Sequence, residues 1–272
     1  MTLTLALREQ PHARVWAQPL APARLGALER SALAEVKLRC GREMVALGEL
    51  FQISGTVDGE LLLMGDLRRF DGIGAGLEEG RLVVEGPCGD HLGARMRGGE
   101  IEVRGGAGDW AGAAMEGGLL RIHGDAGVRL GGAYPGARAG MSGGEIALIG
   151  DAGEEAGAGM RRGLVVIGGR AGAGAGLRML AGTVIALGGL GPEAGFGNRR
   201  GSLVSAAAHR PLPGYELAAS YRPPALALQL RRACALGLEV DERLLKARWV
   251  RWAGDFAELG RGEILILEEE GR

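Results

Sequence analysis

Apolar residues alternate with other residues in short segments that return at a fixed distance along the chain. Ile101 and Val103 form one such segment, and Ile146 and Leu148 form a later one. This alternation, with a period of two, predicts a strand with one buried face. A glycine precedes each segment, and successive glycines are 19 residues apart except for one interval of 26: Gly80, Gly99, Gly118, Gly144, Gly163, Gly182 and Gly201. The chain is therefore predicted to be a tandem array of similar units.

The repeat predicts the fold class. A unit of about 20 residues cannot bury an apolar face alone, so neighbouring units must stack. The same pattern returns in the same direction each time, which requires parallel strands rather than hairpins. With glycine-rich turns and no helical pattern between the strands, the expected architecture is an all-β solenoid, a parallel β-helix of about seven to eight coils.

Corresponding positions of the units are predicted to form ladders through the interior. The first ladder is Leu61, Leu82, Ile101, Leu120, Ile146, Val165 and Val184. The second is Leu63, Val84, Val103, Ile122, Leu148 and Ile167. A narrow ladder of small residues holds Cys88, Ala107, Ala126, Ala152 and Ala171. Cys88 is therefore expected to be a buried structural thiol.

The flanks of the array are expected to cap its open ends, which would otherwise pair with other chains. Residues 1–45 are predicted to form a cap with a strand and a helix, and residues 46–210 to form the glycine-rich repeat. Residues 211–272 are predicted to form a second cap with a helix and a strand. The helix is expected over residues 225–238, where apolar residues recur at helical spacing.

Composition narrows the classes of partner. The 52 glycines among 272 residues are expected at the corners of the units, where a positive φ favours glycine. A net charge of −1 gives no drive toward nucleic acid or a membrane. The N-terminus lacks a signal-peptide pattern and no apolar run reaches membrane-spanning length, so a cytoplasmic location is expected.

The sequence contains neither a recognisable catalytic motif nor a recognisable metal-binding motif. The cysteines at 40, 88 and 234 form no C-x-x-C pair, and the histidines at 12, 91, 123 and 209 lack metal-binding spacing. Neither Lys37 nor Lys246 follows a glycine, which excludes a phosphate-binding P-loop. No cofactor is therefore expected in this chain.

Two features break the uniform pattern and are the candidate contact sites. The enlarged unit after Gly118 carries Tyr134 and Arg138 in a loop that is expected to bulge from the array. Two arginine pairs precede glycines in the same register: Arg161 and Arg162, and Arg199 and Arg200. These six side chains could bind carboxylates of a partner or of an acidic cofactor tail, whereas a solvated edge is the alternative.

Two segments carry a family resemblance. Residues 131–176, which include the run AYPGARAGMSGG, and the later WAGDFAELGRGEIL resemble the C-type subunit of formylmethanofuran dehydrogenase and the matching subunit of the formyltransferase/hydrolase complex. A more distant resemblance is to the glycine-rich domain of glutamate synthase. The resemblance covers residues 37–267 and implies a right-handed β-helix without catalytic residues of its own.

The resemblance also implies partners and cofactors. A hydrolase-like subunit, a formyltransferase and other subunits would form a hetero-oligomer with this chain. The methanofuran-type cofactor, tetrahydromethanopterin and metals would lie in those companions, which transfer a formyl group and release formate. The scarcity of lysine beside abundant arginine is typical of a GC-rich bacterium and favours the formyltransferase/hydrolase complex. The alternatives are a tungsten or molybdenum formylmethanofuran dehydrogenase and a stand-alone enzyme such as an acyltransferase.

Overall fold

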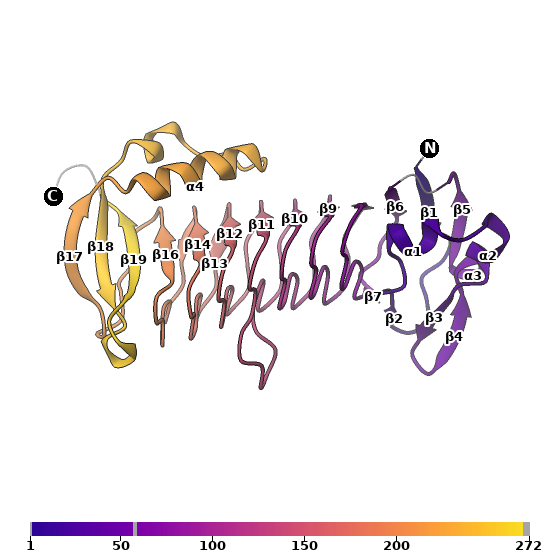
Figure 1. Cartoon of the computed structure of the whole chain (residues 1–272), viewed down its shortest axis with the longest axis horizontal. Helices are drawn as coiled ribbons and strands as arrows, with labels where there is room; N and C mark the ends of the chain where they lie inside the picture. Colours follow the sequence, from indigo (N-terminus) through magenta and orange to yellow (C-terminus); the bar gives the residue numbers. More distant parts are fainter. Residues whose placement is uncertain (1, 57–58, 269–272) are drawn as a thin grey trace.

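The structure is a computed structural model, and it describes residues 2–56 and 59–268. One large sheet of 13 strands runs the length of the molecule (Figure 1). Its middle strands are β6 (Glu60–Met64), β8 (Arg81–Glu85), β9 (Glu100–Val103), β10 (Leu119–Ile122), β11 (Glu145–Leu148), β12 (Leu164–Ile167), β14 (Thr183–Ala186) and β16 (Ser202–Ser205). These strands pair in parallel in the order of the sequence.

The two ends of this sheet contain antiparallel pairs. At one end β1 (Leu3–Leu7) pairs in parallel with β6 and antiparallel with β5 (Phe51–Ser54). At the other end β19 (Gly262–Leu267) follows β16 in parallel, and then β18 (Trp249–Gly254) and β17 (Glu216–Tyr221) are antiparallel. The described chain therefore closes its parallel array with strands from both flanks.

Shorter elements surround the large sheet. A four-stranded sheet near the N-terminus holds β4 (Glu43–Ala46), β3 (Lys37–Cys40), β2 (Val15–Trp16) and β7 (Phe70–Asp71). A two-stranded sheet holds β13 (Arg170–Ala171) and β15 (Gly189–Leu190). The helices are α1 (Pro22–Gly26), α2 (Arg30–Ala34), α3 (Leu47–Leu50) and α4 (Pro224–Ala235), with 3-10 turns η1 (Glu242–Leu245) and η2 (Phe256–Glu258). Among the described residues, none of these helices has the length and apolarity needed to cross a bilayer.

The predicted fold class is wrong. The structure is a large, mostly parallel 13-stranded sheet with few helices, and not a right-handed parallel β-helix built of 19-residue coils. Each middle repeat contributes one regular strand to that sheet. The rest of the repeat is mainly turn, with isolated bridges such as Ala107 to Ala126 and, in two repeats, the short strands β13 and β15. These return segments are rich in glycine and alanine, so they lack the alternating large side chains that favour extended strands.

The strand register inferred from the ladders is confirmed. Leu82 pairs with Ile101, Ile101 with Leu120, and Ile146 with Val165, and all of these side chains are fully buried. A column of methionines closes the same interior: Met96, Met115, Met141, Met160 and Met179. Local alternation thus determined which side chains face the core. The division of the chain at residues 45/46 and 210/211 stays a prediction.

Helix α4 packs on the outer face of the large sheet, the face opposite the ladders, and covers the C-terminal half of the sheet (Figure 1). Leu226, Leu230 and Ala233 recur at helical spacing and pack on outward-facing residues of the middle strands, such as Val166 and Ile185. Pro224 at the start of the helix suits a position whose backbone N–H has no intrahelical acceptor. The helix therefore adds a second apolar layer.

Charged side chains replace this apolar layer on the neighbouring strands. Arg81 on β8 forms ion pairs with Glu60 at 3.1 Å and with Glu102 at 2.7 Å. Arg121 on β10 bonds Glu100 at 3.1 Å, and its Nε donates to the carbonyl of Leu236 beyond the end of α4 at 2.9 Å. The helix therefore ends where the face of the sheet becomes charged.

Candidate functional site

The enlarged repeat between β10 and β11 folds back on the two repeats before it. Its loop extends beyond the row of strands (Figure 1), yet the Tyr134 ring stacks on Trp110 with centroids 5.0 Å apart and planes 12° apart. The Tyr134 hydroxyl also lies 3.0 Å from Nδ1 of His91. The Tyr134 side chain therefore ties the loop to these repeats through ring contacts and a hydrogen bond.

His91 and Trp110 occupy backbone positions that suit glycine. Their φ angles are 62° and 65°, and Gly72, at the same register one repeat earlier, has a φ of 71°. A non-glycine residue in this left-handed region costs about 1–2 kcal/mol. The chain nevertheless presents two aromatic rings here, and sites that retain such a cost are often functional.

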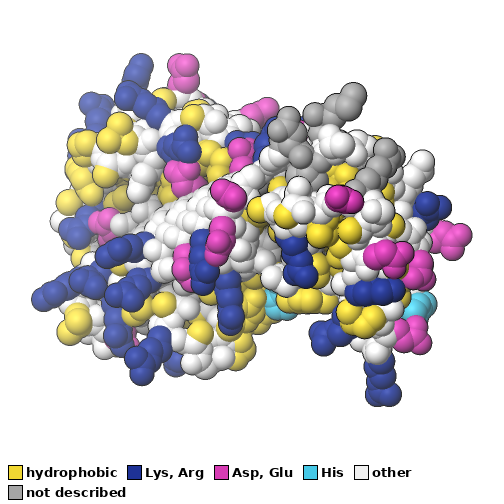
Figure 2. Space-filling view, turned by 45° about the vertical axis from the view of Figure 1, so that its right-hand side comes forward, with side chains coloured by type: hydrophobic (Ala, Val, Ile, Leu, Met, Phe, Trp, Pro, Cys, Tyr) yellow, Lys and Arg dark blue, Asp and Glu magenta, His cyan; other side chains and the backbone are white. Residues whose placement is uncertain are grey.

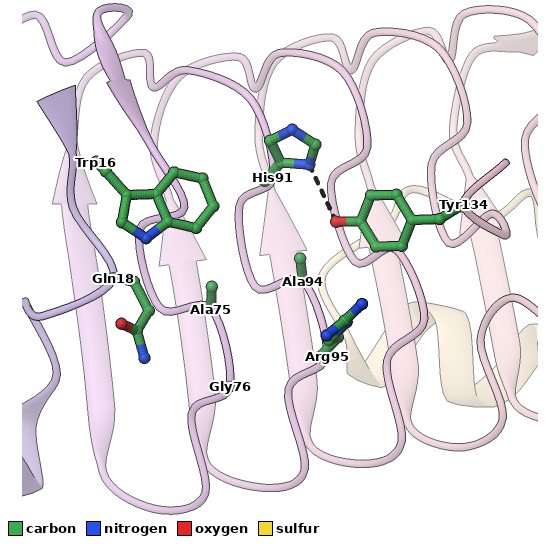
Figure 3. A pocket seen from close by; sticks show the side chains of 8 residues that line it. All are labelled: Trp16, Gln18, Ala75, Gly76, His91, Ala94, Arg95 and Tyr134. Carbon is green, nitrogen blue, oxygen red and sulfur yellow. Dashed lines mark hydrogen bonds between the residues drawn. The ribbon is translucent and has the colours of Figure 1, made fainter. Parts of the chain in front are cut away.

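A cavity of about 440 Å³ opens between Tyr134 and the N-terminal strand β2. We call it the aromatic cavity, and it is lined by Trp16, Gln18, Ala75, Gly76, His91, Ala94, Arg95 and Tyr134. Figure 3 shows Trp16 and Tyr134 on opposite sides, with His91 between them and the small residues Ala75 and Ala94 below. Such a shape, with mainly apolar walls and a few polar groups, is typical of a small-molecule pocket.

Two arginines lie over the aromatic rings. The guanidinium carbon of Arg95 is 5.6 Å from the centre of the Tyr134 ring, and that of Arg129 is 4.8 Å from the Trp110 ring. Burial raises the pKa of the Tyr134 hydroxyl above its ordinary value, although the charge of Arg95 opposes this shift. The hydroxyl is therefore protonated at neutral pH and can bond His91.

A second cavity, of about 520 Å³, lies on the other side of the Tyr134 loop. We call it the arginine cleft, and its charged lining residues are Arg129, Arg138, Arg178, Arg199, Glu155 and Glu258. Glu155 lies 2.5 Å from Arg129, and Glu258 lies 3.0 Å from Arg199. Among the described residues, Arg138 and Arg178 form no ion pair. Figure 2 shows Lys and Arg side chains gathered at the lower left of its view, on the C-terminal half of the molecule.

The structure brings together half of the side chains proposed from the sequence. Tyr134, Arg138 and Arg199 line the arginine cleft. Arg161, Arg162 and Arg200 are exposed and do not line it. Sequence reasoning missed Arg129 and Arg178, and it gave no role to His91, Trp110 or Trp16. The shared register of His91, Trp110 and Arg129 was a signal that could have found three of these residues.

Cys88 is a buried thiol in the structure. Cys88 is buried, as predicted, and its Sγ lies 3.7 Å from the carbonyl of Gly106. Burial raises the pKa of the Cys88 thiol to about 12, so the reactive thiolate is not formed at neutral pH. No group of three or more His, Cys, Asp or Glu side chains in residues 2–56 and 59–268 is placed to hold a metal ion.

Comparison with solved structures gives a match over nearly the whole chain. The matched chain belongs to the crystal structure of the formyltransferase/hydrolase complex from Methylorubrum extorquens in complex with methylofuran. The two chains are 34% identical, the match covers 98% of this chain and 100% of the other, and the TM-score is 0.92. This chain belongs to the family of formyltransferase/hydrolase complex subunits.

Membership of this family confirms that the glycine-rich segments resemble a subunit of the formyltransferase/hydrolase complex. Neither the models of protein families nor the curated proteins contain a match to this chain. The structural match extends through both flanks, beyond residues 37–267 over which the sequence resemblance runs. The N-terminal flank that supplies Trp16 is thus part of the family fold.

Proposed function

We propose that this chain is the C-type structural subunit of a formyltransferase/hydrolase complex and has no active site of its own. Such a complex would move a formyl group between tetrahydromethanopterin and a methanofuran-type cofactor and release formate. The observation that carries this proposal is the 34% identity over 98% of the chain to a chain of such a complex. In this proposal the companion subunits hold the cofactors and metals.

The shape of the molecule suits a supporting role. Each middle strand pairs in register with its neighbours, so the sheet forms one long and continuous hydrogen-bonded unit. Repeat arrays of this kind offer extended surfaces on which several partners can dock. We infer that hydrolase-like and formyltransferase subunits bind along this surface as parts of one hetero-oligomer.

The arginine cleft is the surface to which we assign an acidic partner. Four arginines there face two glutamates, and the two ion pairs leave Arg138 and Arg178 without a carboxylate from the described residues. Guanidinium groups bind carboxylates in a bidentate geometry. The cleft would therefore take acidic side chains of a companion subunit or the glutamate-rich tail of the cofactor, with Arg161, Arg162 and Arg200 extending the same charge.

Purification from the native host tests the structural role. An affinity tag on this chain should bring down hydrolase-like and formyltransferase subunits in fixed ratio. The chain purified alone should neither transfer nor hydrolyse a formyl group. Turnover by the isolated chain would refute the structural role, and assembly of the companions in a strain that lacks the chain would refute its scaffolding function.

Substitution of the unpaired arginines tests the assigned surface. Arg138→Gln combined with Arg178→Gln should leave the melting temperature nearly unchanged, since exposed charges contribute little to folding. The double variant should weaken assembly or turnover about tenfold or more, because each lost charge-assisted bond contributes 1.5–3 kcal/mol, roughly. Arg97→Gln is the matched control, since Arg97 is an exposed arginine that pairs with Glu78 at 2.9 Å outside the cleft. Equal assembly by both variants would remove the cleft from the proposal.

A further inference from the structure

We propose that the aromatic cavity binds a small planar aromatic carboxylate. This site is separate from the arginine cleft, because Tyr134 is the only described residue that lines both cavities. The inference needs no companion subunit and does not rest on the proposed function. It rests on the aromatic side chains that line the cavity and on the guanidinium of Arg95, whose donors have no partner in the described part of the chain.

The walls provide the ring-binding part of the site. The Trp16 and His91 rings have centroids 6.0 Å apart, and those of His91 and Tyr134 are 5.7 Å apart. The three rings therefore surround an open space on three sides (Figure 3). The hydrogen bond between His91 and Tyr134 and the stacking of Tyr134 on Trp110 hold this arrangement without a ligand. A planar ring gains most from such walls by offset or edge-to-face contact.

The floor of the cavity leaves room for a ring. It is made by the small residues Ala75, Gly76 and Ala94. A side chain added at Gly76 would meet no atom within 4 Å, so this part of the cavity is open. The volume of about 440 Å³ is within the range of small-molecule sites.

Arg95 determines the charge of the ligand. Its guanidinium lies at the rim over the Tyr134 ring, and it makes no hydrogen bond or ion pair with the described residues. Arg95 occupies the same register as Gly76 one repeat earlier. Both residues have a left-handed backbone, with φ angles of 57° and 73°. A guanidinium with free donors binds a carboxylate through two parallel bonds.

The same arginine excludes a cationic ligand. Three aromatic walls alone would suit a quaternary ammonium group, but Arg95 already lies over one of them and would repel it. The nearby carboxylates of Asp71 and Asp90 both pair with Arg14, so they do not offset Arg95. A ligand with an aromatic ring and a carboxylate would contact the aromatic walls through its ring and Arg95 through its carboxylate.

Calorimetric titration of the full chain with 2-naphthoate tests the site. We expect one bound molecule per chain with a dissociation constant of about 1 mM or tighter. Cyclohexanecarboxylate keeps the charge and lacks the aromatic ring, whereas 2-naphthamide keeps the ring and lacks the charge. Both should bind at least about tenfold more weakly.

Variants locate the binding. Arg95→Gln and Ala75→Leu should each weaken 2-naphthoate about tenfold or more, the first by removing the cation and the second by filling the floor. Arg97→Gln is the control and should leave the affinity within about twofold. If Arg95→Gln or Ala75→Leu lowers the melting temperature, the affinity is measured with Arg95→Lys instead. This variant should bind 2-naphthoate more weakly than the wild type does, because lysine lacks the paired donors of arginine. No binding at about 10 mM, equal binding of cyclohexanecarboxylate, or an unchanged affinity in the Arg95 variants would overturn the proposal.

Discussion

Tyr134 stacks on Trp110 with ring centroids 5.0 Å apart, although the two residues belong to different repeats. This contact turns an enlarged loop into a wall shared by two cavities. Tyr134 contributes to the aromatic cavity on one side and to the arginine cleft on the other. The loop is therefore a structural part of the candidate site.

Tyr134 is expected to stabilise its loop through both the stacking and the hydroxyl. Tyr134→Phe should lower the free energy of unfolding by about 0.5–1.5 kcal/mol, because the hydrogen bond to His91 is lost. Tyr134→Ala should cost more, since the ring contacts are lost too. Urea unfolding of both variants measures the difference. Loop cleavage by a protease should increase in the same order, and equal values for wild type and Tyr134→Ala would show that the ring does not anchor the loop.

Gly163 is expected to tolerate no side chain. Its φ is 102°, and an added Cβ would lie 2.7 Å from the carbonyl oxygen of Gly144 and 2.7 Å from Cε of Met141. Gly163→Val should therefore lower the free energy of unfolding by several kcal/mol, about 3 or more.

Glu154→Ala is the suitable control for Gly163→Val. Glu154 is exposed, whereas its neighbour Glu155 is half-buried and pairs with Arg129. Equal melting temperatures for Gly163→Val and Glu154→Ala would contradict the tight approach of neighbouring repeats.

Helix α4 offers a matched pair of leucines. Leu230 is fully buried against the sheet, whereas Leu228 is 64% exposed. Leu230→Ala should lower the free energy of unfolding by about 2–5 kcal/mol, and Leu228→Ala by less than about 0.5 kcal/mol. Thermal or urea unfolding distinguishes them. Similar losses for both would mean that α4 does not pack on the sheet through this face.

Glu102 is expected to make stability depend on acid pH. Burial alone would raise the pKa of this carboxyl, but the hydrogen bond from Arg81 and the charge of Arg121 outweigh it and hold the pKa below its ordinary value. A depressed folded-state pKa stabilises the protein above the unfolded-state pKa of about 4.3, and this contribution is lost as pH falls through the folded-state value.

Glu102→Gln measures this contribution. The difference in unfolding free energy between wild type and variant should be largest near pH 7 and should shrink below about pH 4. Glu154→Gln is the control and should change the unfolding free energy only slightly, because Glu154 is exposed and forms no ion pair among the described residues. A difference for Glu102→Gln that is constant from neutral to acid pH would contradict the assigned ion pairs.

The sequence by itself determined the register of the repeats. Period-two alternation and the spacing of 19 residues place Ile101 opposite Leu120, and the enlarged interval still places Leu120 opposite Ile146. Such facts are local, because slipping a strand by one residue against its neighbour would turn its apolar residues from the buried face to the solvent. Family membership could also be predicted, since the glycine-rich segments carry it.

Only the tertiary structure decided the fold class and the candidate site. The glycine-rich segments between the strands form mainly turns, and the flanks add antiparallel strands to the sheet. The alternation of apolar residues within the repeats predicts neither feature. Trp16 comes from the N-terminal flank and Tyr134 from the enlarged repeat, yet both line one cavity with His91. Arg121 bonds the carbonyl of Leu236, which the sequence places far away. These contacts depend on how separate segments dock, and docking depends on the shape and charge of surfaces that exist only after the sheet has formed.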